Sequence, residues 1–164
     1  MKKLTYLLSA GFLVVLLAAV GCGNDDGGNL SPQDAAGVNF EDTWVVGTSG
    51  SVFFESEDRT ADYSNFTLTT VYTAGQGEGT YTTTGGPTGA SPWPSSGVWS
   101  FNSNEPDANA FQVTRDDGLV IDVVITGDTM TLNFLFNDAS HKTDQEGRIE
   151  AVDGNWTFTL SRQQ

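Results

Sequence analysis

Residues 129–136 read TMTLNFLF, an eight-residue run in which Met130, Leu132, Phe134 and Phe136 alternate with mostly polar positions. Side chains of a strand point alternately to its two faces, so this period of two places the four apolar residues on one buried face. The stretch therefore predicts a half-buried β-strand.

The same alternation continues on both sides of this run. Residues 119–126 (LVIDVVIT) and 155–161 (NWTFTLS) repeat it, and turn dipeptides at 117–118, 127–128 and 153–154 separate the runs. Gly and Asp tolerate the positive φ of tight hairpins. Shorter strands are expected at residues 43–46, 51–55, 65–73, 80–84 and 97–102, followed by one that begins at Ala110. This pattern predicts an all-β domain of about eight or nine antiparallel strands in up-and-down order, a barrel or alternatively a β-sandwich.

The first 22 residues have a different character. Lys2 and Lys3 precede an apolar stretch from Leu7 to Val20, which is too short for a comfortable membrane span, and Gly21 and Cys22 follow. This arrangement resembles a bacterial lipoprotein signal peptide with its lipobox. The resemblance implies removal of residues 1–21, attachment of palmitate-type acyl chains to Cys22 and a lipid anchor in the cell outer membrane. An uncleaved anchor helix is the alternative.

Residues 23–26 (GNDD) are similar to the surface-export signal of Bacteroidota lipoproteins, which would place the domain on the outer face of that membrane; a plain solvated linker is the alternative. We interpret residues 22–40, which are rich in Gly, Asp and Asn, as the lipidated N-terminus and a flexible tether. The folded domain is expected over residues 41–164.

The net charge and the cysteine content exclude several kinds of partner and site. The formal net charge is −14, and it falls to near −16 without Lys2 and Lys3. Such a chain should be repelled by nucleic acid and remain a monomer. Cys22 is the only cysteine, and its acylation would leave none for a disulfide, a thiol nucleophile or a zinc–thiolate site.

Within the domain, Trp44 in DTWVV (42–46), the closing run GNWTFTL (154–160) and the meander between them resemble the lipocalin-like domains of Bacteroidota lipoproteins. The resemblance implies that Arg162 stacks over Trp44 near the barrel floor. It also implies a barrel that can hold a small apolar or glycan ligand. The residues expected to line such an interior are Phe66, Trp99, Phe101, Phe134 and Phe136.

Trp93 is the one large aromatic in a Gly-, Pro- and Ser-rich loop at residues 85–97. Long loops often carry function. The indole is a candidate to cover a pocket or to stack on a sugar, and the alternative, which we favour, is that it tucks against the barrel end.

Motifs for chemistry are weak. His141, the only histidine, adjoins Ser140 in a polar loop, which is not the arrangement of a catalytic triad. Neighbouring acids such as Asp116 and Asp117 suit a turn better than glycoside chemistry, and the acidic loops at residues 55–58 and 138–146 lack a calcium-binding pattern. We expect no enzyme activity, no cofactor and no metal. Asp128-Thr129-Met130 resembles the O-glycosylation motif of Bacteroidota secreted proteins.

Two functions remain. The first is a non-catalytic, lipid-anchored structural or partner-binding protein of the cell envelope. The alternative is binding of a small apolar or glycan ligand inside a lipocalin-like barrel. An eight-stranded barrel is just wide enough to be filled by side chains or to hold one small ligand, so the state of the interior decides between them.

Overall fold

A computed structural model describes residues 30–88, 91–137 and 152–164 of the chain. Predictions for Cys22, residues 23–29, His141 and the loop at 138–146 lie outside these ranges. The elements are α1 (Pro32–Phe40), β1 (Asp42–Val45), β2 (Ser51–Phe54), β3 (Glu57–Asp58), a 3₁₀ helix η1 (Thr60–Tyr63), β4 (Thr67–Thr73), β5 (Glu78–Thr84), β6 (Ser96–Phe101), β7 (Ala110–Arg115), β8 (Val120–Thr126), β9 (Thr129–Phe136) and β10 (Gly154–Arg162).

The strands form a closed antiparallel barrel. Strands β4 to β10 pair in chain order, β1 pairs with β4, and β1 also pairs with β10, which closes an eight-stranded ring. The β2–β3 hairpin extends the sheet from β10. The predicted all-β, up-and-down meander is confirmed, and its lipocalin-like closure follows from pairing between the first and last strands.

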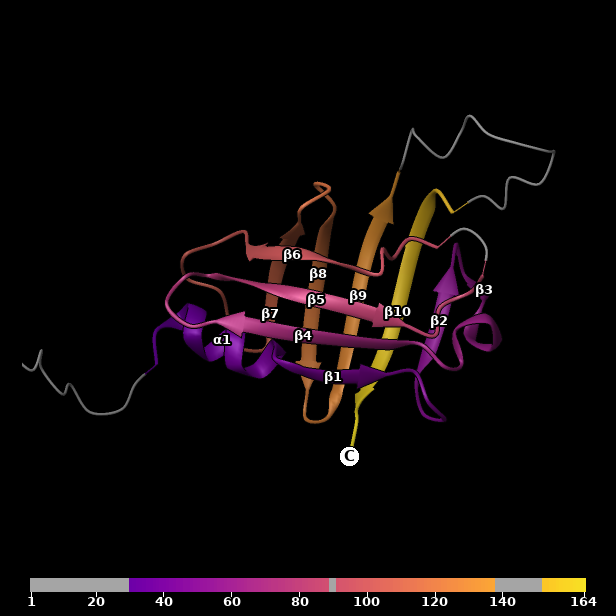
Figure 1. The fold of residues 1–164 in the computed structure, drawn as a ribbon, viewed down its shortest axis with the longest axis horizontal. Coiled ribbons are helices and arrows are strands. Elements are labelled where there is room, and N and C mark those ends of the chain that lie inside the picture. Colours follow the sequence, from indigo (N-terminus) through magenta and orange to yellow (C-terminus); the bar gives the residue numbers. More distant parts are fainter. Residues whose placement is uncertain (1–29, 89–90, 138–151) are drawn as a thin grey trace, which may run out of the picture.

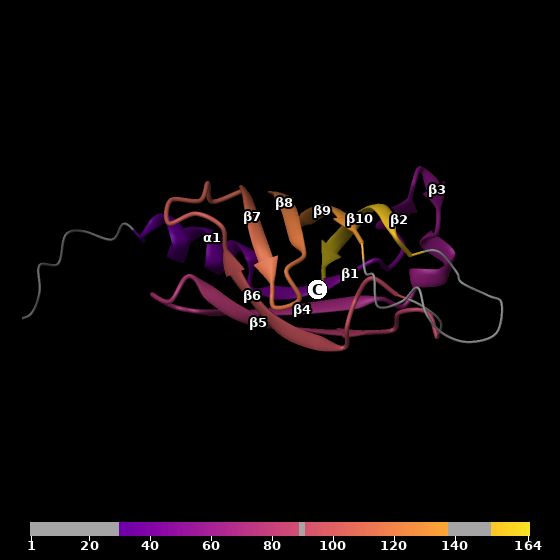
Figure 2. The same ribbon diagram turned by 90° about the horizontal axis from the view of Figure 1, so that it is seen from above.

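The barrel is flattened into two layers. Figures 1 and 2 show β4, β5 and β6 in one layer, while β7 to β10 and β2 cross them steeply in the other. Such crossed layers let the inward side chains of both sheets interdigitate in one core. Helix α1 lies at one end of the long axis, and β3 with η1 lies at the other (Figure 1).

Alternation fixes the register of the strands. In β9 the four predicted inward residues are all buried, and Met130, Leu132 and Phe134 stand opposite Leu160, Phe158 and Trp156 of β10. A slip by one residue would turn both apolar rows to solvent, so the core itself specifies this pairing.

The barrel wall has an opening where the pairing of β10 changes from β2 to β1. Residues 156–159 of β10 pair with β2, and residues 161–162 pair with β1, which continues to β4. Tyr63 of η1 packs between these elements, with its ring centroid 5.8 Å from Phe66, 5.8 Å from Trp156 and 5.1 Å from Phe158. The short helix therefore fills the opening that the split creates.

Helix α1 corrects the predicted tether of residues 22–40 over the part from Pro32 to Phe40. Pro32 occupies the first turn, and the Ser31 hydroxyl caps the helix by accepting a hydrogen bond from the Asp34 amide at 3.1 Å. Ala36, Gly37 and Phe40 are buried against the barrel. Gly37 permits this approach, because a Cβ there would lie 2.5 Å from the Tyr72 ring. Across the three described ranges, no helix combines the length and the apolar character needed to cross a membrane.

The contact expected from the lipocalin-like resemblance is present. Arg162 stands opposite Trp44 in the β1–β10 pair, and its guanidinium carbon lies 4.9 Å from the indole centre. The same guanidinium reaches Asp42 at 3.1 Å and donates to the Asn39 carbonyl at 3.1 Å. Arg162 therefore joins the last strand, the first strand and the end of α1.

Candidate functional site

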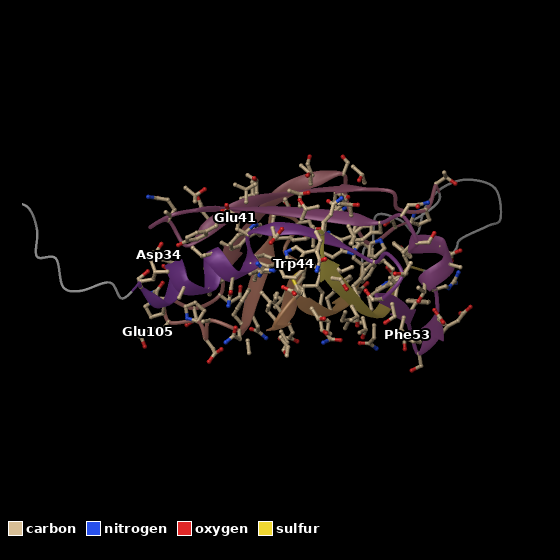
Figure 3. The ribbon with its side chains drawn as sticks, turned by 90° about the horizontal axis from the view of Figure 1, so that it is seen from below. Asp34, Glu41, Trp44, Phe53 and Glu105 are labelled. Atoms are coloured by element: carbon tan, nitrogen blue, oxygen red, sulfur yellow. The ribbon has the colours of Figure 1, made fainter. Side chains whose placement is uncertain are left out.

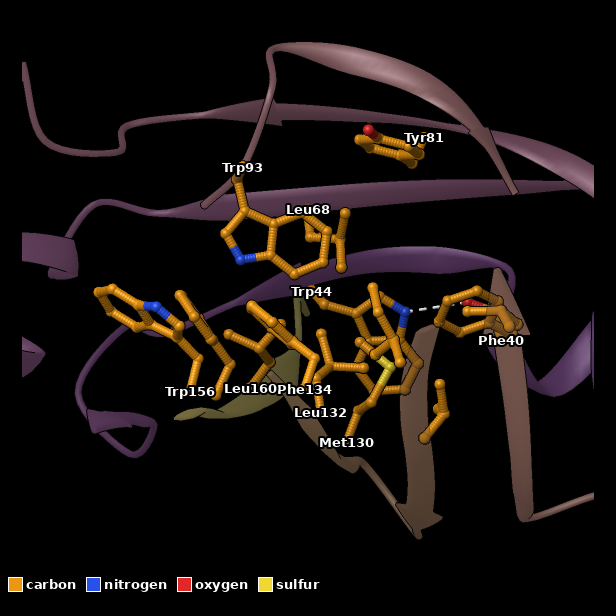
Figure 4. Packing of buried hydrophobic residues seen from close by; sticks show 14 of the residues in the cluster. Phe40, Trp44, Leu68, Tyr81, Trp93, Met130, Leu132, Phe134, Trp156 and Leu160 are labelled. Atoms are coloured by element: carbon orange, nitrogen blue, oxygen red, sulfur yellow. Dashed lines mark hydrogen bonds between the residues drawn. The ribbon is translucent and has the colours of Figure 1, made fainter. Parts of the chain in front are cut away.

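The interior of the barrel is packed with side chains (Figure 4). Among the described residues, the cavity at its centre has a volume of about 10 Å³, roughly the space that one water occupies, and the atoms exposed in its wall are apolar. A drug-sized ligand needs a pocket of about 300 Å³ or more. This cavity is lined by Phe40, Leu68, Thr70, Tyr81, Trp93, Trp99, Val113, Arg115, Ile121 and Leu132.

The residues expected to line a ligand space pack against other side chains of the core. Phe66, Trp99, Phe134 and Phe136 are buried, and Phe101 is partly buried against the core. Phe134 stacks on Phe158 at 5.9 Å, Trp99 meets Phe40 edge-on at 4.9 Å, and Phe101 lies 5.2 Å from Trp99. Such ring pairs contribute about 0.5–1.5 kcal/mol each beyond the area they bury.

Trp93 lies inside the mouth of the barrel and is only 8% exposed. Its ring centroid is 5.6 Å from Phe134, 5.8 Å from Phe158 and 5.9 Å from Phe66. The loop thus supplies a plug for the barrel end, as the tucked arrangement predicts. In this position the indole cannot stack on a sugar in solution.

A buried arginine holds this plug, and sequence reasoning missed it. Arg115 is 3% exposed at the end of β7, and its Nη1 donates to the Pro92 carbonyl at 2.8 Å. Its Nε donates to Asp117 Oδ1 at 3.1 Å, and its Nη2 is bonded to Asp117 Oδ2. The guanidinium carbon lies 5.2 Å from the Trp93 ring and 5.8 Å from the Tyr81 ring. The alternation of the strand could have revealed its burial, because Arg115 lies on the same inward face of β7 as Phe111 and Val113.

Two titratable groups of the mouth, Asp117 and Tyr81, have shifted pKa values. Burial opposes ionisation of Asp117, but hydrogen bonds from Arg115 and the Leu119 amide outweigh it and lower the pKa of this carboxyl. Burial raises the pKa of Tyr81 to about 12. In the described part of the chain, the Tyr81 hydroxyl and the Trp93 indole nitrogen are buried without a hydrogen-bond partner. This arrangement suits a locked plug better than proton transfer.

The acidic loop at residues 55–58 does not converge on one point. The Glu55 carboxylate binds Asn155, and Glu57 lies 3.6 Å from Arg59. Hydrogen bonds from the Thr60 side chain and from the Thr60 amide, the latter 2.9 Å long, lower the pKa of Asp58. Over residues 30–88, 91–137 and 152–164, no three His, Cys, Asp or Glu side chains are grouped as metal ligands. Thr129 is exposed at the β8–β9 hairpin.

Comparison with known proteins found no matching family model, no matching curated protein and no matching solved structure.

Proposed function

We propose that this chain is a non-catalytic, lipid-anchored protein of the cell envelope that acts as a structural or partner-binding module through its outer surface. The observation that carries the proposal is the filled interior, with its cavity of about 10 Å³ beneath the Trp93 plug. A closed β-barrel is compatible with ligand binding, but this one uses its interior for packing.

The placement of α1 supports an anchored orientation. The side chain of Asp34 fixes the start of the helix to the β4–β5 turn, because its Oδ1 accepts hydrogen bonds from the Tyr72 hydroxyl at 2.8 Å and the Gly75 amide at 2.9 Å. Asn39 at the other end of the helix donates to the Ala108 carbonyl at 3.0 Å. A tether from Cys22 would reach the barrel at this end, so the opposite end, with Trp93 and η1, would be directed away from the membrane.

The proposal is tested by native mass spectrometry of the full chain purified from its own host. We expect acyl chains on Cys22 and no further mass, and we expect Cys22→Ala to move the protein from the membrane fraction to the soluble fraction. A small molecule that is retained in the native state and lost on denaturation would instead establish the alternative, a ligand carried inside the barrel. An unmodified Cys22 would overturn the anchor.

A further inference from the structure

The outer face of the barrel carries a hollow of about 430 Å³ beside the β2–β3 hairpin, lined by Phe53, Glu55, Ser56, Asn155 and Thr157. Four polar residues, which carry hydroxyl, amide and carboxylate groups, surround one aromatic ring there. Phe53 stands opposite Thr157 in the β2–β10 pair, in the outward row, and is 37% exposed. Figure 3 shows Phe53 at the periphery of the molecule, whereas Trp44 lies within it.

The hairpin turn that forms one wall of this hollow has two non-glycine residues in an unfavourable backbone conformation. Glu55 and Ser56 have φ values of 48° and 73°, in the left-handed region that tight hairpins normally fill with Asn and Gly. The turn is held by Asn155, whose backbone amide and side-chain amide donate to Glu55 Oε1 at 2.7 and 3.0 Å. The Glu55 amide donates back to the Asn155 carbonyl at 2.9 Å. Backbone outliers that the surroundings hold in place cluster at ligand sites.

These contacts leave hydrogen-bonding groups directed to the hollow. Glu55 Oε1 accepts both bonds from Asn155, so within the described part of the chain the second oxygen, Oε2, has no partner. Ser56 is exposed and adds a hydroxyl that can donate or accept. Thr157 is already oriented, because its hydroxyl is 2.8 Å from the Asn133 side-chain oxygen.

The charges around the hollow favour a neutral ligand over an anionic one. Each arginine in the described ranges is paired with an acid: Arg59 with Glu57 and Asp62, Arg115 with Asp117, and Arg162 with Asp42. The hollow itself carries the Glu55 carboxylate. An anionic ligand would therefore meet repulsion with no unpaired arginine from these ranges to offset it. A neutral molecule with hydroxyl groups and one apolar face fits both the ring and its polar surround.

We infer that this hollow binds a neutral glycan, with one sugar ring packed on Phe53 and its hydroxyls bonded to Glu55, Ser56 and Asn155. The inference rests on the proposed function, because it identifies the ligand class and the place on the outer surface. Preorganisation by the Glu55–Asn155 bonds limits the ordering cost on the protein side.

The test uses the full chain in a detergent without a sugar headgroup, titrated with neutral gluco-, manno-, galacto- and xylo-oligosaccharides up to ~10 mM, as expected for a single small site. Binding is followed by calorimetry and by the NMR shift of the Asn155 side-chain amide. We expect saturable binding of at least one neutral series and none of polygalacturonate. Phe53→Ala should weaken binding at least tenfold, Phe53→Trp should retain it, and the matched control Val98→Ala, an exposed apolar residue on β6, should leave it unchanged.

The inference is overturned if no neutral oligosaccharide saturates the site, or if Phe53→Ala binds as tightly as the parent chain. Binding of an apolar peptide with the same dependence on Phe53, and of no glycan, would also overturn it in favour of a protein partner. These results leave the filled interior and the anchor untouched. A ligand found inside the barrel would overturn the proposed function instead, so the two failures are distinguishable.

Discussion

Replacing Asp117 by Ala tests whether the buried arginine dominates the energetics of the barrel mouth. The Arg115 side chain is 1% exposed and the Asp117 side chain is 41% exposed. Removing the carboxylate strands a positive charge in the core, and breaking a buried ion pair in this way costs about 3–5 kcal/mol. Water can reach the vacated surface position, so we expect the low end, a loss of about 3 kcal/mol in the free energy of unfolding.

The same substitution in an Arg115→Met background isolates this effect. That background removes the charge while keeping most of the side-chain volume, and it leaves the buried Pro92 carbonyl without its donor, at a cost of about 1–3 kcal/mol. Asp117→Ala then removes only the bond from the Leu119 amide, 3.1 Å long, which is worth about 1 kcal/mol. We therefore expect a coupling energy of about 2 kcal/mol between Arg115 and Asp117.

Urea denaturation at neutral pH, followed by tryptophan fluorescence, measures all four proteins of this cycle. A total stability of about 5–15 kcal/mol would keep each variant folded in water. Equal costs of Asp117→Ala in both backgrounds would refute the reasoning, because the guanidinium would then be hydrated without its partner. A cost below about 1 kcal/mol in the parent chain would refute it as well.

Three further predictions address the plug, the buried tyrosine and the start of α1. Trp93→Ala should lower the free energy of unfolding by about 3–5 kcal/mol, and added indole should raise the melting temperature of this variant but not of the parent chain. Burial raises the pKa of Tyr81 to about 12, so the unfolded chain loses this proton first; stability should fall between about pH 10 and 12, and less so in Tyr81→Phe. Hydrogen bonds from Ser31, the Gly75 amide and Tyr72 lower the pKa of Asp34, so its contribution is present above the ordinary value of 3.8 and lost as pH falls below it; denaturation curves from pH 2 to 6 should show a smaller acid dependence for Asp34→Asn.

The strands could be predicted because their physical signal is local. Alternation over several residues and the glycines of tight turns report on one strand and one hairpin at a time. Gly118 and Gly127 adopt φ values of 85° and 58° at the turns where the sequence placed them. The closing pair between β1 and β10 has no such local signal, and it was expected only through the resemblance carried by Trp44 and Arg162.

Helix α1 was missed because its burial has no helical period to detect. Its buried residues are Ala36, Gly37 and Phe40, and most of its other residues are types common in polar linkers. Its stability comes from the Ser31 cap and from bonds to distant loops, such as Asn39 to the Ala108 carbonyl. Tertiary contacts of this kind override weak local preference.

Arg115 and the Phe53 hollow were missed for opposite reasons. Arginine is usually exposed, whereas strand parity places Arg115 inside the barrel. Only the fold shows that Asp117 and the Pro92 carbonyl can accept its hydrogen bonds there. Phe53 would be assigned to a core by its hydrophobicity, yet parity in β2 buries its neighbour Val52 and turns Phe53 outward. In both cases the position in the strand determines whether the side chain points into the core or to solvent, and the residue type alone gives the wrong answer.

The interior of this barrel is completed by residues that do not belong to its strands. Phe40 enters from α1, Tyr63 from η1 and Trp93 from the β5–β6 loop, and each makes ring contacts with inward residues of the strands. An eight-stranded barrel leaves room for either side chains or one small ligand, and these three rings take that room. Because connecting segments do the filling, the strand pattern that predicts a barrel carries no information on whether the barrel is open. A binding role for this chain therefore has to use side chains that the core does not need, and Phe53 with its polar surround is such a set.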